Sequence, residues 1–250
     1  MKRIKLVVAY DGTNYHGWQV QPNGVTIEHV LNEALSELLS EPIHVIGASR
    51  TDSGVHAHGN IAVFDTGHRM PADRIWIALN QRLPEDIRVR SSEEVPADWH
   101  PRKVNSTKVY EYRILNSKSE IPTERLYTHF CYFPLSVEAM QKAAGYLVGE
   151  HDFKSFCSIN TQAIHTVRTI YSLTVEKQGD IISIRVSGGG FLYNMVRIIA
   201  GTLIEVGRGF YPPERVAEIL AAGNRKMAGP TAVAKGLTLI RIMPESIEKT

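Results

Sequence analysis

The chain has 250 residues, of which 43% are hydrophobic and 22% charged, with a formal net charge of +2 at pH 7. This composition is typical of a globular protein with a sizeable core, and no stretch reaches the about 20 apolar residues of a membrane-spanning helix. The small net charge neither requires nor excludes a polyanionic partner, so the distribution of the cations along the chain matters more.

The N-terminus is basic and then apolar, as a signal peptide is, but Asp11 interrupts the apolar run and no small-residue cleavage site follows. We therefore predict an N-terminal strand and a cytoplasmic protein. The two cysteines, Cys131 and Cys157, lack the CxxC spacing. The sequence thus predicts neither a disulfide framework nor a thiolate metal site.

Hydrophobic spacing in the first half of the chain predicts the element order β-α-β-β-α-β. Strands are expected at residues 3–10, 43–47, 60–66 and 86–91, and helices at residues 26–40 and 71–81. Thr26 is placed to cap the first helix, and Pro71 lies near the start of the second. Between the second and third strands, residues 48–59 are rich in small side chains and predict a loop.

The second half of the chain is predicted to repeat this order. Strands are expected at residues 107–115, 168–177, 181–187 and 237–242, helices at residues 136–148 and 191–206, and a further short helix from residue 212. Ser136 is placed to cap the first of these helices. The pair Gly179-Asp180, between two of the strands, is typical of a hairpin turn.

Because the order of elements recurs, we predict an α+β fold of two ferredoxin-like, RNA-recognition-like halves with mainly antiparallel sheets. The expected halves are residues 1–100 and residues 101–250. A cleft between two such halves is a natural place for a ligand.

The predicted loop contains the candidate chemistry. Arg50 and Asp52 lie two residues apart, so both side chains leave the same face if the segment is extended. A guanidinium close to a carboxylate keeps that carboxylate ionised and oriented. An ionised, positioned carboxylate can attack a sugar or base carbon. The alternative is that Asp52 only closes a turn while Arg50 pairs with it at the surface, and composition alone favours that alternative.

A second feature is the mixture of aromatic and basic residues between Trp99 and Arg113. Aromatic side chains stack on unpaired bases and cations contact phosphates, so this mixture suits RNA binding.

Several separated motifs, in the same order, resemble the tRNA pseudouridine synthase A family over nearly the whole chain. The pattern Arg-Thr-Asp-x-Gly-Val-His-Ala at residues 50–57 resembles the family signature. Further similar segments are residues 9–19, 99–103, 110–112, 190–197 and 235–237. This sequence departs from the family pattern at Trp99, Pro101, Tyr193 and Val233.

The resemblance implies an isomerase that converts uridine to pseudouridine at positions 38, 39 and 40 in the anticodon stem-loop of tRNA. It implies a homodimer and no cofactor, because no electrons or groups are exchanged with the surroundings. A uridine inside a stem must leave its stack before an enzyme can reach it, so base flipping is expected.

The resemblance also implies roles for individual residues. Asp52 matches the catalytic aspartate, and Arg50 matches the arginine that enters the RNA and helps to displace the base. Tyr110 matches the tyrosine that packs on the flipped uracil. Arg197 matches the basic residue that pairs with the aspartate, in keeping with a charge on an otherwise apolar helix. The segment expected to touch RNA provides Trp99, His100, Arg102 and Lys103.

A metal site is a weaker hypothesis for the same loop. His56 and His58 with Asp52 form a possible ligand set. The loop of the resembled family binds no metal, so we expect none.

Two further alternatives remain open. One is a non-catalytic RNA-binding protein, for which the sequence lacks the expected run of aromatics. The other is a base glycosylase, which would release free uracil.

Overall fold

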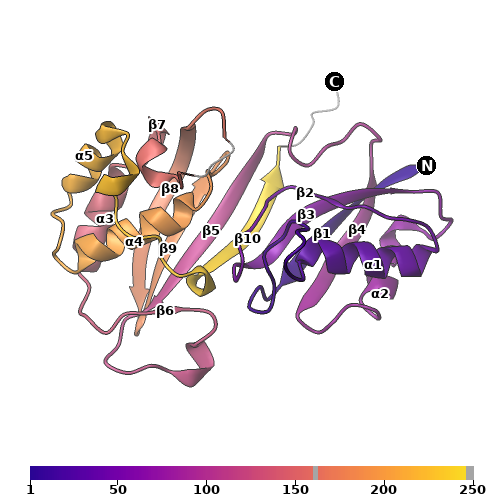
Figure 1. Ribbon diagram of the computed structural model, residues 1–250, viewed down its shortest axis with the longest axis horizontal. Helices are drawn as coiled ribbons and strands as arrows, with labels where there is room; N and C mark the ends of the chain where they lie inside the picture. Colours follow the sequence, from indigo (N-terminus) through magenta and orange to yellow (C-terminus); the bar gives the residue numbers. More distant parts are fainter. Residues whose placement is uncertain (160–162, 246–250) are drawn as a thin grey trace. The chain divides into compact units, whose positions relative to one another are not determined.

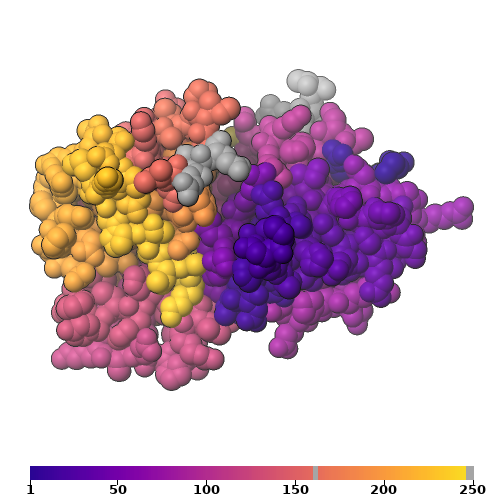
Figure 2. All heavy atoms as spheres, viewed as in Figure 1, coloured from indigo at the N-terminus to yellow at the C-terminus, as the bar shows by residue number. Residues whose placement is uncertain are grey.

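The computed structural model describes residues 1–159 and 163–245, and these residues form two compact units. The first unit comprises Met1–Ser106 and Leu239–Thr250, and the second comprises Thr107–Thr238. Figure 1 shows the course of the chain through each unit, and Figure 2 shows one face of the molecule with all heavy atoms as spheres. The predicted division at residue 100 into two folding domains stays a prediction.

The first unit is an α+β structure whose strands follow the order β4-β1-β3-β10, with the short β2 beside β3. The pairings of β1 with β3 and with β4 are antiparallel. Its elements are β1 (Lys2–Tyr10), α1 (Ile27–Leu39), β2 (Ile46–Gly47), β3 (His56–Thr66), α2 (Ala72–Leu79), β4 (Ile87–Val95) and most of β10 (Leu237–Pro244).

Alternation along β1 builds the core of this unit. Every second side chain from Ile4 to Tyr10 is buried, because successive residues of a strand point to opposite faces of the sheet. The same face is covered by α1 and α2, which bury side chains such as Leu31 and Ile75 completely (Figure 1). Each fully buried aliphatic side chain contributes roughly 1.5–3 kcal/mol to folding. Thr26 caps α1 as predicted, accepting a hydrogen bond from His29 N.

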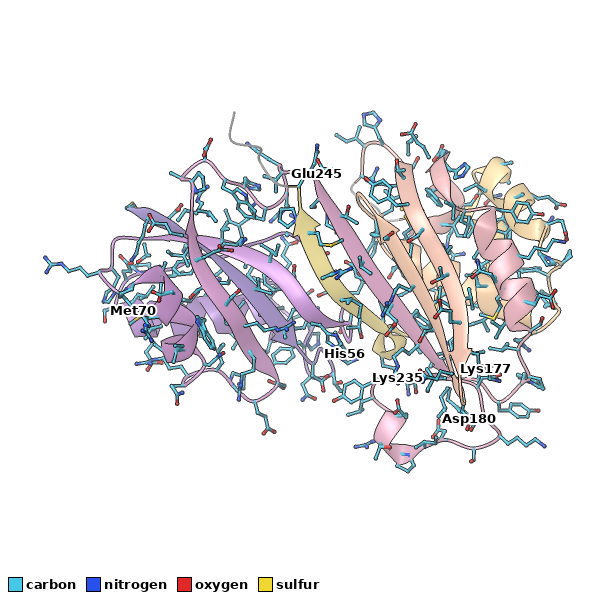
Figure 3. The ribbon with its side chains drawn as sticks, turned by 180° about the vertical axis from the view of Figure 1, so that it is seen from behind. His56, Met70, Lys177, Asp180, Lys235 and Glu245 are labelled. Carbon is cyan, nitrogen blue, oxygen red and sulfur yellow. The ribbon has the colours of Figure 1, made fainter. Side chains whose placement is uncertain are left out.

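The second unit has the strand order β5-β9-β8-β7, with β6 pairing in parallel with β5. Lys177 and Asp180 mark the hairpin between β8 and β9 in Figure 3, where Gly179 has a φ of +58°. The elements of this unit are β5 (Ser106–Leu115), β6 (His129–Phe130), α3 (Val137–Gly145), β7 (Gly149–Asp152), β8 (Val167–Gln178), β9 (Ile181–Gly188), α4 (Met195–Gly207) and α5 (Arg215–Ala222).

The α+β class with a mainly antiparallel sheet is confirmed, but several boundaries were wrong. β3 begins at His56, inside the predicted loop 48–59. Of the predicted strand 43–47, only Ile46–Gly47 pairs, because the backbone N–H groups of Ile43 and Val45 bind side chains of α1 instead. α4 begins at Met195 rather than at residue 191. The short β6 and β7 were not predicted. Among the described residues, no helix is long and apolar enough to cross a membrane.

Close helix packing in the second unit gives a stability prediction. A Cβ atom on Gly201 of α4 would lie 1.8 Å from the carbonyl oxygen of Pro230. We expect Gly201→Ala to lower the free energy of unfolding by roughly 1–3 kcal/mol, the usual cost of overpacking. Gly145, the last residue of α3, has no neighbour within 4 Å of the same position. The control Gly145→Ala should be neutral or stabilising by up to about 1 kcal/mol. Urea unfolding measures both, and an unchanged midpoint for Gly201→Ala would contradict the packing described.

Candidate active site

The loop between β2 and β3 places Asp52 at the first position of a tight turn. The N–H of Val55 donates to the carbonyl oxygen of Asp52 at 3.1 Å. Gly54, the third residue of the turn, has a φ of +76°, a conformation that glycine adopts without steric cost. The turn leaves Asp52 half-buried and Arg50 exposed. The loop therefore presents a carboxylate and a guanidinium from one short stretch of chain.

The segment Asp11–Trp18 lies along this loop and holds its backbone. The N–H of Trp18 donates to Thr51 O at 3.0 Å, and the N–H of Gly54 donates to Tyr15 O at 3.3 Å. Two glycines make the close approach possible. A Cβ on Gly12 would lie 2.1 Å from Val55 O, and one on Gly17 would lie 2.6 Å from Thr51 O. No larger residue fits at either position without moving the loop.

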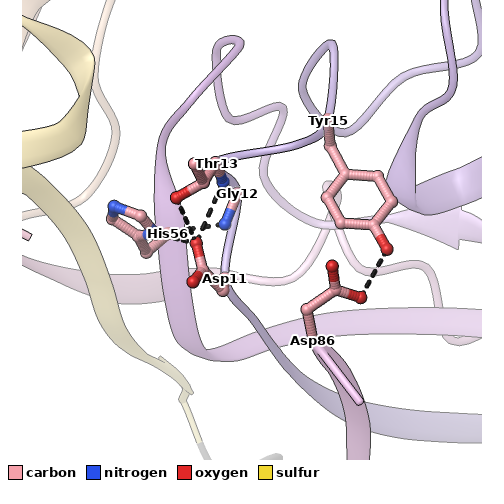
Figure 4. Close-up of polar contacts among 6 residues, drawn as sticks. All are labelled: Asp11, Gly12, Thr13, Tyr15, His56 and Asp86. Atoms are coloured by element: carbon pink, nitrogen blue, oxygen red, sulfur yellow. Dashed lines mark hydrogen bonds and ion pairs between the residues drawn. The ribbon is translucent and has the colours of Figure 1, made fainter. Parts of the chain in front are cut away.

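His56 fastens the start of the same segment (Figure 4). Its Nδ1 atom lies 3.1 Å from the backbone N of Gly12 and 3.1 Å from Asp11 Oδ1. One nitrogen cannot accept from an N–H and donate to a carboxylate at the same time. The contact with the Gly12 amide requires the ring proton on Nε2. Thr13 then satisfies the Asp11 carboxylate, donating to Oδ1 from its hydroxyl at 2.6 Å and from its N–H at 3.0 Å.

Asp86 anchors the segment from the other side (Figure 4). The Tyr15 hydroxyl donates to Asp86 Oδ1 at 2.6 Å, and the N–H of Asp11 donates to Asp86 O at 2.9 Å. Burial and this carboxylate both raise the pKa of the Tyr15 hydroxyl far above its ordinary value. The hydroxyl therefore stays protonated and remains a donor at any physiological pH.

Asn60 fixes the loop from within the sheet. It is fully buried on β3, and its Nδ2 donates to Ser49 O at 2.9 Å and to the Tyr10 hydroxyl at 3.3 Å. Its Oδ1 accepts from the N–H groups of Ser49 and Ile61 at 3.3 and 2.9 Å. The Tyr10 hydroxyl in turn lies 2.7 Å from Thr51 Oγ1. Ser49 therefore binds the Asn60 amide directly, and Thr51 is connected to it through the Tyr10 hydroxyl. These two residues lie on either side of Arg50.

The two histidines of the metal hypothesis lie in different environments. His56 is buried and engaged by Gly12, whereas His58 is exposed. Within residues 1–159 and 163–245, no group of three or more His, Cys, Asp or Glu side chains is placed to hold a metal ion.

Residues 99–103 lie in the same unit as the loop. Arg102 Nε donates to Gly47 O at 2.9 Å, so this residue is attached to β2. Burial, and then the charge of Arg50, lower the pKa of Arg102. Two like charges so close together favour an anionic ligand beside the loop. Burial, and then the charges of Lys103 and Arg102, lower the pKa of His100 below its ordinary value.

Trp99, in the segment expected to touch RNA, is largely buried. The ring is only 9% exposed, and Lys5 Nζ lies over it at 5.9 Å from the centroid. Arg3 Nη1 donates to the Trp99 carbonyl at 3.0 Å. Both contacts fix the start of the basic segment against β1.

Tyr110 and Arg197 belong to the second unit. Tyr110 lies on β5 with its ring edge-to-face against Phe191, at 5.3 Å between centroids. Arg197 lies in the first turn of α4 and is half-buried. Its Nε donates to Ala232 O at 2.8 Å and its Nη1 to Asn194 Oδ1 at 2.9 Å. The structure thus gives each predicted residue a defined place within its own unit.

The supporting residues Tyr10, Asn60, Asp86 and Asn194 were not predicted from the sequence. Asn60 and Asn194 are single polar residues next to apolar ones, a pattern that ordinary turns and strand ends also show. For Asn60 the sequence does contain one signal, its place within an apolar strand. An Asn inside the run Gly-Asn-Ile-Ala-Val-Phe is a poor strand former and requires hydrogen-bond partners when buried.

These features describe an α+β protein whose loop between β2 and β3 presents a carboxylate and a guanidinium two residues apart. A family model described as tRNA pseudouridine synthase matches residues 6–102 and 143–243. The chain is 49% identical to a tRNA pseudouridine synthase A from Brevibacillus brevis, over 97% of this chain and 100% of that protein. It is 46% identical to one from Thermoanaerobacter sp., over the same shares. The chain therefore belongs to the tRNA pseudouridine synthase family, whose members are isomerases.

A more distant likeness is to a chain in the crystal structure of a Cbf5–Nop10–Gar1 complex. That alignment covers 96% of this chain and 50% of the other, at 12% identity and a TM-score of 0.37. So remote a similarity decides nothing about this site.

The Asn60 network gives a prediction with a matched control. Asn60→Leu keeps the volume but leaves the buried Ser49 N–H and C=O without partners, so we expect a stability loss of roughly 2–4 kcal/mol. Turnover of the folded protein should fall on the order of 10²-fold, because the loop is no longer held in position. The Asn80 side chain likewise makes two hydrogen bonds, one with the N–H and one with the C=O of Val89. Asn80→Leu should reduce stability but leave turnover unchanged, and equal turnover losses would show that Asn60 has no special link to the loop.

Proposed function

We propose that this protein converts uridine to pseudouridine at positions 38, 39 and 40 in the anticodon stem-loop of tRNA, with Asp52 as the catalytic carboxylate. The observation that supports this most is the loop 50–57. Its sequence matches the family signature, and its backbone is held by Asn60 and by residues 11–18. A merely structural turn at the surface does not need such support.

The reaction balances without a cofactor. Arg50 displaces the target base from its stack, and the Tyr110 ring packs on the uracil. The N1–C1′ bond breaks, the uracil turns within the site, and C5 bonds to C1′. The proton on C5 leaves and N1 gains one, so the product has the composition of the substrate. The Asp52 carboxylate forms an adduct or acts as a base at the sugar, and Arg197 stabilises its charge.

RNA binding in this proposal relies on the segment from Trp99 to Lys103. Arg102 and Lys103 contact phosphates, and His100 offers a hydrogen bond. Since the Trp99 ring is buried, its contribution is to hold the segment in place. The tRNA contacts both units, which act as ferredoxin-like halves of one enzyme. We propose further that the enzyme is a cytoplasmic homodimer that needs no metal ion.

The central test separates chemistry from binding. Asp52→Asn is nearly isosteric, and residue 52 contributes its backbone carbonyl to the turn, so the loop should keep its shape. An amide cannot act as nucleophile or base, so turnover should fall on the order of 10⁴-fold or more. Binding of tRNA should persist, since a negative charge near the RNA is removed.

The assay is to incubate unmodified tRNA with the parent and variant proteins and to map pseudouridine, with free uracil measured in parallel. Pseudouridine at near the parent rate from Asp52→Asn would refute the role of Asp52. Free uracil from the parent would identify a glycosylase, and tRNA binding without either product would identify a binding protein.

The basic segment gives a second test. Lys103 is exposed, so Lys103→Ala should remove one phosphate contact, weaken tRNA binding and lower the salt slope by about one unit. Turnover at saturating tRNA should change little. Arg102→Ala also breaks the hydrogen bond to Gly47 O, so it should reduce turnover as well. Identical effects of the two variants on turnover would contradict a separate anchoring role for Arg102.

A further inference from the structure

We propose that Asn194 is a positioning residue that orients the Arg197 guanidinium through its side-chain amide. This inference rests on the proposed function, in which Arg197 stabilises the catalytic carboxylate. Asn194 itself has no role in the proposed function, and the inference gives it one: it sets the direction of the Arg197 guanidinium.

Two acceptors fix the guanidinium from different sides. Arg197 Nη1 donates to Asn194 Oδ1 at 2.9 Å, and Nε donates to Ala232 O at 2.8 Å. The backbone of the same two segments is joined as well, since the N–H of Ala232 donates to Arg197 O at 3.1 Å. Two hydrogen bonds from one planar group fix its plane as well as its position. Loss of the Asn194 contact removes one of these two constraints on the plane.

The backbone of Asn194 is unusual for the residue that precedes a helix. A helix-capping Asn adopts an extended conformation and accepts a hydrogen bond from the second or third helical N–H. Asn194 instead has φ 60° and ψ 7°, in the left-handed region, and makes no capping bond. It shares a positive φ with one other non-glycine residue in the described parts of the chain, Ser40.

The side chain of Asn194 is used across the turn instead. While Oδ1 accepts from Arg197, Nδ2 donates to Ser158 Oγ at 2.8 Å. The N–H of Ser158 also donates to Tyr193 O at 3.1 Å, so the segment before α4 is held at two points. The amide therefore connects an anchored serine to the arginine, and its orientation is determined at both ends.

Two unfavourable features meet at this helix start. The helix lacks its side-chain cap, and Arg197 brings a positive charge to the positive end of the helix dipole. Asn194 also takes a left-handed conformation, which asparagine tolerates better than most residues but in which it does not cap the helix. A helix designed for stability alone would avoid such a start. Unfavourable local geometry that is held in place by the surrounding structure is typical of functional sites, which points to the orientation of Arg197 as the function.

Asn194→Gly is the most informative variant, because glycine adopts φ 60° without strain but has no amide. We expect kcat to fall by about tenfold or more, with KM for tRNA and the urea midpoint nearly unchanged. Asn194→Asp keeps an acceptor at the same position and tolerates the left-handed region, so it should restore kcat to within about threefold of the parent. A glycine variant with parent kcat would overturn the inference.

A double-mutant cycle tests whether Asn194 acts through Arg197. On the Arg197→Ala background, Asn194→Gly should cause no further loss of kcat, whereas losses that multiply would show an independent role. If the glycine variant unfolds, Ser158→Ala replaces it in the cycle and should give a smaller loss that is also absent without Arg197. Asp52→Asn is assayed in parallel. Full activity of that variant would reject the proposed role of Asp52, on which this inference rests, whereas an inactive Asp52→Asn with an unaffected Asn194→Gly would reject only the present inference.

Discussion

A single buried amide, that of Asn60, determines where the backbone of the loop between β2 and β3 lies. An unpaired amide in the core would cost several kcal/mol, so the side chain must find partners, and those it finds are both backbone groups of Ser49 and the Tyr10 hydroxyl. Because the buried Asn60 must form these hydrogen bonds, it fixes the position of the loop backbone at Ser49. Since the Tyr10 hydroxyl also reaches Thr51, the chain is fixed immediately before Asp52.

The second support of the loop is steric. Residues 11–18 approach the loop so closely that Gly12 and Gly17 have no room for a side chain. His56 and Asp86 then hold this segment through the Gly12 amide and the Tyr15 hydroxyl. In the second unit, Arg197 is likewise held by neighbouring groups, namely one side-chain amide and one backbone carbonyl. In both units, polar groups next to the residues of the proposed chemistry determine where those residues lie.

Much of the fold could be predicted because local patterns agreed with burial. The helical spacing and the Thr26 cap placed α1 within a residue at each end, and alternation placed β1 equally well. The start of α4 was missed because Phe191 and Leu192 continue its apolar pattern, whereas the left-handed backbone of Asn194 prevents the helix from starting earlier. The strand at 43–47 was overestimated because Asn32 and Ser36 of α1 take the hydrogen bonds that a neighbouring strand would have received. Interactions between residues distant in sequence have no local pattern.

The contacts that shape the loop also determine when it can form during synthesis. Tyr10 and Thr51 are 41 positions apart, and Asn60 lies 50 positions from Tyr10. Such non-local contacts form only after the intervening chain has closed, which makes them late events in folding. A nascent chain that has just emerged as far as Asp52 therefore has the carboxylate but not yet the shape around it. The loop becomes ordered only when β3 follows and brings Asn60 into the sheet, so the part of the protein with the proposed chemistry is assembled together with the core that surrounds it.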